Sequence, residues 1–217
     1  MANKKLYLIS GLGADQTVFN RLHLADFEVV FLDWIEPLKN ETLGSYALRL
    51  AEKIKEPDAS ILGLSMGGMI ASEIVRMNPG MRAVIISSNR TRHEFPPFLR
   101  FLARYFPLYE LSTKFTMRMV FPVSSWILGA ESPEDRKHLR GVIDRTNLSF
   151  VKWCIRSIVR WNLETPQPRI IHIHGTNDRL LPYRLVNPDY TIEGGGHLMI
   201  RNRAEELSAL IRQLLMG

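Results

Sequence analysis

The sequence predicts an α/β protein with a mostly parallel six-stranded sheet and helices on both of its faces. Short apolar or β-branched runs alternate with amphipathic helical patterns over most of the 217 residues. The runs are continuously apolar, which is typical of strands buried on both faces of a parallel sheet. Residues 90–165 break this alternation, because they contain helical patterns and no strand pattern. We therefore expect one core, formed by 1–89 and 166–217, with 90–165 inserted as a helical unit.

Six runs bounded by Gly, Asp, Ser or Pro are the predicted strands. They are residues 6–9, 27–32, 60–62, 83–86, 169–174 and 189–192. The helical patterns of the core cover about 15–22, 42–56, 67–78 and 202–215. Thr42 and Asn202 are expected to cap their helices, and Asn78-Pro79-Gly80 is expected to end the third one.

The segment 90–165 predicts three or four amphipathic helices. The patterns are 98–105, 111–120, a helix starting at Ser132-Pro-Glu-Asp, and 149–161. Something has to cover their aromatic faces, and the nearest candidate is the edge of the sheet where ligands bind in open α/β folds.

The net charge of +6 is concentrated in this same segment. It carries 13 Lys+Arg and 7 Asp+Glu, whereas the rest of the chain has 15 of each, and it holds 12 of the 20 aromatic residues. The aromatics fall at helical core spacing without a recognition motif, so we expect no nucleic-acid partner, and interfacial membrane contact is a weaker possibility. Basic residues of the segment could attract an anionic acyl substrate or simply form a solvated helix face. They are Arg90, Arg92, Arg100 and Arg104.

Composition also indicates a compartment. The single cysteine, Cys154, cannot form an internal disulfide, and no Cys/His cluster has structural-zinc spacing. The N-terminal apolar run is too short for a signal peptide, and no stretch approaches eighteen apolar residues. We expect a cytoplasmic protein without stable membrane anchoring.

The most informative motif is Gly63-Leu-Ser65-Met-Gly67, a G-x-S-x-G between an apolar strand and a helix. The glycines suit a turn so sharp that a side chain two residues from the serine would strike neighbouring backbone. Ser65 is thereby lifted out of the sheet at a helix N-terminus, which predicts a nucleophile; the alternative is an ordinary helix cap.

A serine hydroxyl needs a base and a group that orients the base. Asp178 lies in the loop that follows the strand 169–174, and His197 lies in a glycine-rich loop after the last strand. The chain order Ser, Asp, His is that of the α/β-hydrolase arrangement.

These residues resemble the α/β-hydrolase superfamily, and the similarity covers nearly the whole chain outside 90–165. The resemblance implies Ser65 as nucleophile, Asp178 as acid and His197 as base. It also implies that 90–165 is a cap, and that the fold is a shortened version lacking the family's first two strands.

Two backbone N–H groups are needed to hold a developing oxyanion. Met66, directly after the nucleophile, is expected to supply one. By resemblance the other comes from Leu12, in the loop after the first strand. Ser10 stands where the family usually has histidine, which leaves the hydrogen bonding inside this loop open.

Other interpretations compete for parts of this pattern. Gly11-Leu-Gly13 with Asp33 resembles a dinucleotide fingerprint, but Gln16 replaces its third small residue. His172 and His174 could be a metal pair on one strand face, although a buried strand is the stronger explanation.

The acid that orients His197 also has competitors. Glu94 is the serious rival to Asp178, because some members of the family place the acid after the strand ending near residue 87. Asp144 and Asp189 are weaker candidates.

The resulting expectation is a serine hydrolase that cleaves a small or medium carboxylic ester or thioester without metal or organic cofactor. The alternative is a non-hydrolytic protein of this fold, either a ligand receptor or a cofactor-free lyase or peroxidase.

Overall fold

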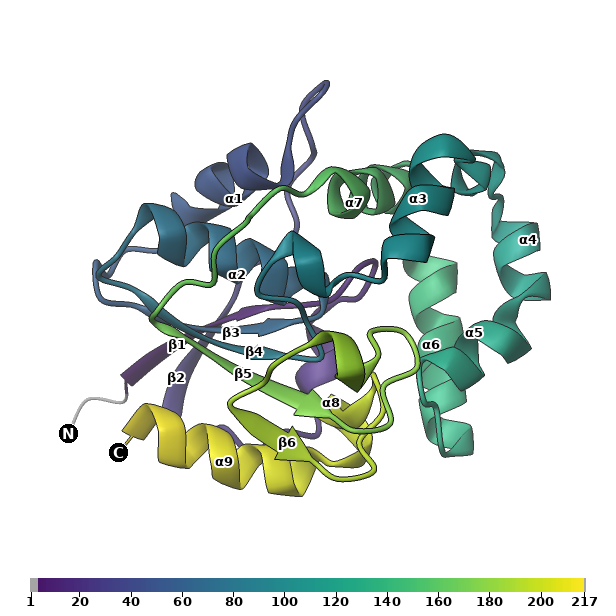
Figure 1. Cartoon of the computed structure of the whole chain (residues 1–217). Helices are drawn as coiled ribbons and strands as arrows, with labels where there is room; N and C mark the ends of the chain where they lie inside the picture. The colour runs from purple at the N-terminus through teal and green to yellow at the C-terminus, as the bar shows by residue number, and fades with distance from the viewer. Residues whose placement is uncertain (1–3, 217) are drawn as a thin grey trace.

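A computed structural model describes residues 4–216 and contains one six-stranded sheet (Figure 1). The strand order is β2-β1-β3-β4-β5-β6, and every neighbouring pair is parallel. The strands are β1 (Lys4–Ile9), β2 (Phe27–Phe31), β3 (Ser60–Leu64), β4 (Arg82–Ile86), β5 (Ile170–Gly175) and β6 (Tyr190–Ile192). All six predicted strands are confirmed, and the reversal of order beside β1 places the carboxyl ends of β1 and β3 where ligands bind in such sheets.

Alternate side chains of the strands enter two separate cores. On one face, Tyr7, Ile9 and Ile61 pack with α1 (Leu43–Ala51), α2 (Met66–Met77) and part of α7 (Leu148–Arg160). On the other face, Leu6, Leu8 and Leu62 pack with α8 (Met199–Asn202) and α9 (Ala204–Met216). Helices therefore cover both faces of the sheet, as predicted from the continuously apolar strands (Figure 1).

Three core helices differ from their predicted ranges. The pattern at 15–22 forms only a 3₁₀ turn, η1 (Gln16–Phe19), because 20–26 has to return the chain to β2. Thr42 caps α1 through a capping box, but α1 ends before residue 56 so that Ile54 can enter the core. Asn202 ends α8 instead of capping α9, and its side-chain amide donates to the carbonyl of Gly129 at 2.9 Å.

The chain between β4 and β5 is helical and lies beyond the carboxyl ends of the strands (Figure 1). Its elements are η2 (Arg92–Glu94), α3 (Pro97–Tyr105), η3 (Leu108–Leu111), α4 (Lys114–Met119), α5 (Phe121–Ile127), α6 (Pro133–Arg145) and α7. It has more helices than predicted, because Thr113 starts α4 near the beginning of the 111–120 pattern and a separate helix, α5, follows at Phe121 with Pro122 in its first turn. Ser132 caps α6 as expected.

The expectation that the aromatic faces of these helices are covered is correct for only part of the segment. α7 buries Trp153 against Tyr46 of α1, with ring centroids 4.5 Å apart. In contrast, α3, η3 and α4 contain no buried residue. Helical spacing of apolar residues indicates which side chains share a face, and it does not show that another element covers that face.

Within residues 4–216, no helix combines the length and apolar character required to cross a bilayer.

Candidate active site

Ser65 occupies the sharp turn between β3 and α2. Its backbone has φ 52° and ψ −120°, in the left-handed region that non-glycine residues rarely adopt. Hydrogen bonds on both sides hold this conformation: Ser65 N–H donates to the Ile86 carbonyl at 2.9 Å, and the Ser88 hydroxyl donates to the Ser65 carbonyl at 2.6 Å. Such strain persists only where the surrounding structure over-determines it, which points to a functional position.

The two glycines of the motif are required by close backbone contacts. A Cβ on Gly63 would lie 2.6 Å from the Gly67 carbonyl oxygen, and a Cβ on Gly67 would lie 2.3 Å from that of Ile9. Both distances are far below van der Waals contact, so the serine can sit at this turn only if these positions lack side chains.

The structure brings Ser65, His197 and Asp178 into one hydrogen-bonded chain. His197 Nε2 lies 3.1 Å from Ser65 Oγ, and His197 Nδ1 lies 2.8 Å from Asp178 Oδ2. Because an ionised carboxylate can only accept, Nδ1 carries the proton and the Nε2 lone pair faces the serine hydroxyl. This is the tautomer in which histidine can take the proton of Ser65.

Two loops at the carboxyl ends of neighbouring strands present Asp178 and His197. Asp178 follows β5 and His197 follows β6. The loops are tied together by a hydrogen bond from Asn177 N–H to the Gly195 carbonyl at 2.9 Å. Leu198 N–H donates to the Leu128 carbonyl at 2.9 Å, which fastens the histidine loop to the helical segment.

The Asp178 carboxylate is buried and satisfied at both oxygens. Oδ1 accepts hydrogen bonds from the N–H groups of Leu180 at 2.9 Å and Leu181 at 2.8 Å, which leaves Oδ2 to His197. Burial by itself raises the pKa of Asp178, but the electrostatic interaction and hydrogen bond with His197 and the hydrogen bond from the Leu181 N–H outweigh it and lower the pKa below its usual value. Asp178 is therefore ionised at neutral pH and able to stabilise an imidazolium.

A second pair of histidines lies behind Asp178. His174 Nε2 is 2.8 Å from the Leu181 carbonyl and 3.5 Å from Asp178 Oδ2, so this nitrogen is the protonated one. Its Nδ1 is then the acceptor for His172 Nε2, 3.0 Å away. Both rings are fully buried, and burial lowers the pKa of each, so both are neutral.

Sequence reasoning did not connect these two histidines with Asp178. It considered them as a metal pair, but in the described part of the chain no group of three or more His, Cys, Asp or Glu side chains is arranged to hold a metal ion. The available signal was their spacing: His172 and His174 share one face of a strand that leads directly into the Asp178 loop.

The rival acids are engaged elsewhere. Glu94 accepts a hydrogen bond from the Arg90 N–H, Asp144 pairs with Arg118, and Asp189 pairs with Arg90. None of the three contacts His197, whose Nδ1 is occupied by Asp178.

The loop after β1 approaches Ser65 from the side of the predicted oxyanion donors. A Cβ on Gly11 would lie 3.3 Å from the Ser65 Cβ, and the next residue, Leu12, lines the same cavity as Ser65. Met66 directly follows Ser65 as the first residue of α2. The Ser10 hydroxyl closes the loop by donating to the Ala14 carbonyl at 2.8 Å. Ser10 thus gives the loop an internal hydrogen bond in place of the expected histidine.

A cavity of about 300 Å³ lies over Ser65 and His197. Its wall is mostly apolar and comes from both the sheet side and the helical segment, including Leu64, Val120, Phe121, Leu139, Val142 and Leu180. No lysine or arginine contributes to this wall among residues 4–216, so the basic residues of 90–165 do not face it. A larger cavity of about 570 Å³, beside loop 36–42 and α7, contains none of the Ser65, His197 and Asp178 side chains.

A parallel α/β sheet with a strained serine between a strand and a helix is the arrangement of α/β-hydrolase proteins. In this chain the serine lies within hydrogen-bond distance of His197, and His197 in turn bonds the buried Asp178 carboxylate. The family model described as "Alpha/beta hydrolase family" matches residues 6–210, and the chain belongs to this family. The dinucleotide interpretation of the loop after β1 is thereby replaced.

Solved structures show the same fold at low sequence identity. A thermophilic esterase from Thermogutta terrifontis is 17% identical with a TM-score of 0.72, over 98% of this chain and 89% of that one. A hydrolase from Pseudomonas aeruginosa PA01 is 15% identical with a TM-score of 0.75, over 99% and 91%. The N-acyl homoserine lactonase AidH, complexed with N-butanoyl homoserine, is 15% identical with a TM-score of 0.71, over 99% and 89%. No curated protein matches the sequence.

Proposed function

We propose that this chain is a serine hydrolase that cleaves small or medium carboxylic esters or thioesters through an acyl-enzyme. The observation that carries the proposal is the continuous chain from Ser65 Oγ through His197 to the buried Asp178 carboxylate. A strained serine at the wall of a mostly apolar cavity has little structural purpose, whereas a nucleophile requires this arrangement.

In the proposed reaction, Ser65 Oγ attacks the substrate carbonyl while His197 Nε2 takes its proton. The tetrahedral oxygen accepts hydrogen bonds from the N–H groups of Leu12 and Met66. His197 then protonates the departing alcohol or thiol. The same imidazole activates a water molecule that releases the acid, and Asp178 stabilises the imidazolium at both stages.

The cavity supports an apolar acyl group. Its wall contains few polar side chains besides the reacting ones, namely Ser124, His138 and Thr146. Burial and the nearby Arg201 charge lower the pKa of His138, so it adds no positive charge to the cavity near neutral pH. An uncharged acyl chain therefore fits the cavity better than the anionic acyl substrate considered from the sequence.

The first experiment is intact-protein mass spectrometry after treatment with a fluorophosphonate. We expect one label per chain in the wild type and in Ser149→Ala, which removes an exposed serine, and none in Ser65→Ala. A folded wild-type protein without label would contradict the proposal and favour the ligand-receptor or lyase alternative.

The second experiment identifies the substrate class. We expect hydrolysis of p-nitrophenyl esters and acyl thioesters with apolar acyl chains. An N-acyl homoserine lactone belongs in the panel, because a lactone is an internal ester and AidH shares the fold. Faster turnover of acyl groups that end in a carboxylate would contradict the apolar assignment of the cavity.

A further inference from the structure

Exposed apolar side chains gather on one part of the helical segment. Of the nineteen large apolar residues that are substantially exposed within 4–216, thirteen lie between 98 and 126. They include Phe98 (69% exposed), Phe101 (54%), Leu111 (75%), Phe115 (70%) and Trp126 (60%). We call the exposed apolar side chains of residues 98–126 the apolar insert face. Such a concentration of exposed apolar side chains on one segment of a folded protein points to a site of interaction.

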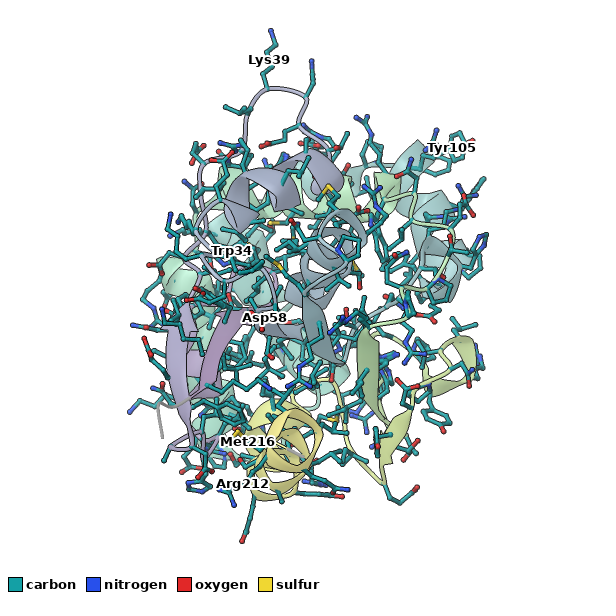
Figure 2. The ribbon with its side chains drawn as sticks, turned by 90° about the vertical axis from the view of Figure 1, so that its left-hand side faces the viewer. Trp34, Lys39, Asp58, Tyr105, Arg212 and Met216 are labelled. Carbon is teal, nitrogen blue, oxygen red and sulfur yellow. The ribbon has the colours of Figure 1, made fainter. Side chains whose placement is uncertain are left out.

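These side chains point away from the core. Phe98, Phe101 and Tyr105 recur at the spacing of a single helix face on α3, and the rings of Phe101 and Tyr105 are 4.9 Å apart. α3, α4 and α5 form the outer side of the segment, opposite the sheet (Figure 1). Tyr105 projects from the periphery of the molecule (Figure 2).

Positive charge accompanies this apolar surface. Residues 98–126 contain four basic residues, Arg100, Arg104, Lys114 and Arg118, and one acidic residue, Glu110. Glu110 is paired with Arg156 of α7, and Arg118 is paired with Asp144 of α6, both at 2.6 Å, so the positive charge of the face rests on Arg100, Arg104 and Lys114. Two such faces would repel each other, which disfavours a second copy of the chain as the partner, and an anionic partner is favoured.

The apolar insert face also reaches the candidate active site. Val120 is 55% exposed on this face and lines the cavity above Ser65. Leu99, Leu108, Val123 and other aliphatic members of the face offer nothing on which a nucleic-acid base could stack. An interior of acyl chains, by contrast, accommodates aliphatic and aromatic side chains alike.

We propose that the apolar insert face docks on an anionic lipid surface. The apolar side chains enter the interfacial region, while Arg100, Arg104 and Lys114 meet the lipid phosphates. Docking does not depend on the proposed hydrolase function. If both hold, an acyl substrate dissolved in the lipid layer enters the cavity beside Val120 without crossing water.

The test is co-sedimentation of the full chain with lipid vesicles, using Ser65→Ala so that no lipid is hydrolysed. We expect binding to vesicles of phosphatidylcholine mixed with phosphatidylglycerol, weaker binding to phosphatidylcholine alone, and release as salt is raised. Arg104→Glu should weaken binding at low salt more than fivefold. Lys53→Glu, which reverses an exposed charge outside the helical segment, should have little effect.

The apolar contribution has its own pair of variants. Phe101→Ser with Phe115→Ser should lower vesicle affinity at least tenfold, since both rings leave water on docking. The matched control is Val29→Ser with Leu48→Ser, which removes exposed apolar side chains outside the face and should bind as the parent does. Circular dichroism checks the fold of each variant.

Several results would overturn the proposal. They are absence of binding to anionic vesicles, an equal loss in the control pair, or a lipid-free dimer that dissociates only in the Phe101/Phe115 variant. Equal affinity for a single-stranded oligonucleotide would reassign the face to nucleic acid. Fluorophosphonate labelling separates the two proposals. If the wild type is labelled but Ser65→Ala does not bind vesicles, only docking is refuted. If the wild type is not labelled but binds vesicles, only the hydrolase function is refuted.

Discussion

Replacing Asp178 by asparagine should reverse the proton arrangement of His197. The Oδ1 position accepts two backbone N–H groups, from Leu180 and Leu181, so the carbonyl oxygen of an asparagine is held there. Its NH₂ group then faces His197 Nδ1 from the Oδ2 position, 2.8 Å away. An amide NH₂ only donates, so Nδ1 becomes the acceptor and the proton moves to Nε2. His197 would then present a donor to Ser65 instead of a lone pair.

The expected loss is large because the general base is missing while the side-chain volume is unchanged. A histidine held in the wrong tautomer lowers kcat about ten-thousand-fold, which corresponds to about 5.4 kcal/mol of transition-state stabilisation. KM should change little, since the cavity wall is intact. The assay is steady-state hydrolysis of a p-nitrophenyl ester, with urea unfolding to show that the variant is folded.

Glu94→Gln is the matched control, because Glu94 was the rival acid and its carboxylate is bonded to the Arg90 N–H. We expect its kcat to stay within a few-fold of wild type. If Asp178→Asn remains within tenfold of wild type while Glu94→Gln loses activity, the assignment of the acid is wrong.

Three further predictions concern the glycine turn and the buried histidines. Gly67→Ala should destabilise the fold by about 3 kcal/mol and lower Tm by about 6–12 °C, because its Cβ would lie 2.3 Å from the Ile9 carbonyl oxygen. Gly44→Ala is the control, since its Cβ would lie 3.4 Å from its nearest neighbour, a Glu73 carboxylate oxygen, and should leave Tm unchanged. Equal Tm values for the two variants would refute the contact at Gly67. His174→Leu should lower kcat about tenfold with little change in KM, because it removes the N–H donor beside Asp178. His174→Gln keeps a donor there and should retain activity. If both variants have the same kcat, His174 has no positioning role. Burial lowers the pKa of His172 and of His174, so the unfolded chain binds protons on these rings more readily than the folded chain does. Stability should therefore be full well above the ordinary imidazole pKa of about 6.5 and fall as the pH drops below it. Urea unfolding of wild type and of His174→Gln, about one pH unit above and about one pH unit below 6.5, checks this. An equal loss of stability in the two proteins would contradict a contribution from His174.

The sequence was a good guide to local structure. All six strands were visible as short apolar runs, because a strand buried on both faces has to be apolar at nearly every position. The turn at Ser65 was equally visible, since only glycine fits at positions 63 and 67, where backbone segments approach within 2.6 Å of any added Cβ. Thr42 and Ser132 were identified as helix caps for a similar reason: capping depends on a few adjacent residues.

Long-range contacts decided what the sequence left open. Asp178 rather than Glu94 contacts His197 because the loop after β5 is the one that meets the histidine loop. The hydrogen bond between His172 and His174 behind Asp178 likewise depends on how the buried side chains of β5 pack in the folded sheet. Periodicity placed the aromatics of 98–126 on helix faces, yet it could not show that the faces on α3 and α4 stay uncovered. The spacing of apolar residues within one helix indicates which side chains share a face of that helix. Which other element, if any, packs against that face is seen only in the folded structure. The strands, the sharp turn at Ser65 and the chain order Ser65, Asp178, His197 thus follow from short stretches of sequence. The contacts of Asp178, the cavity and the exposed apolar surface depend instead on packing between segments far apart in the chain.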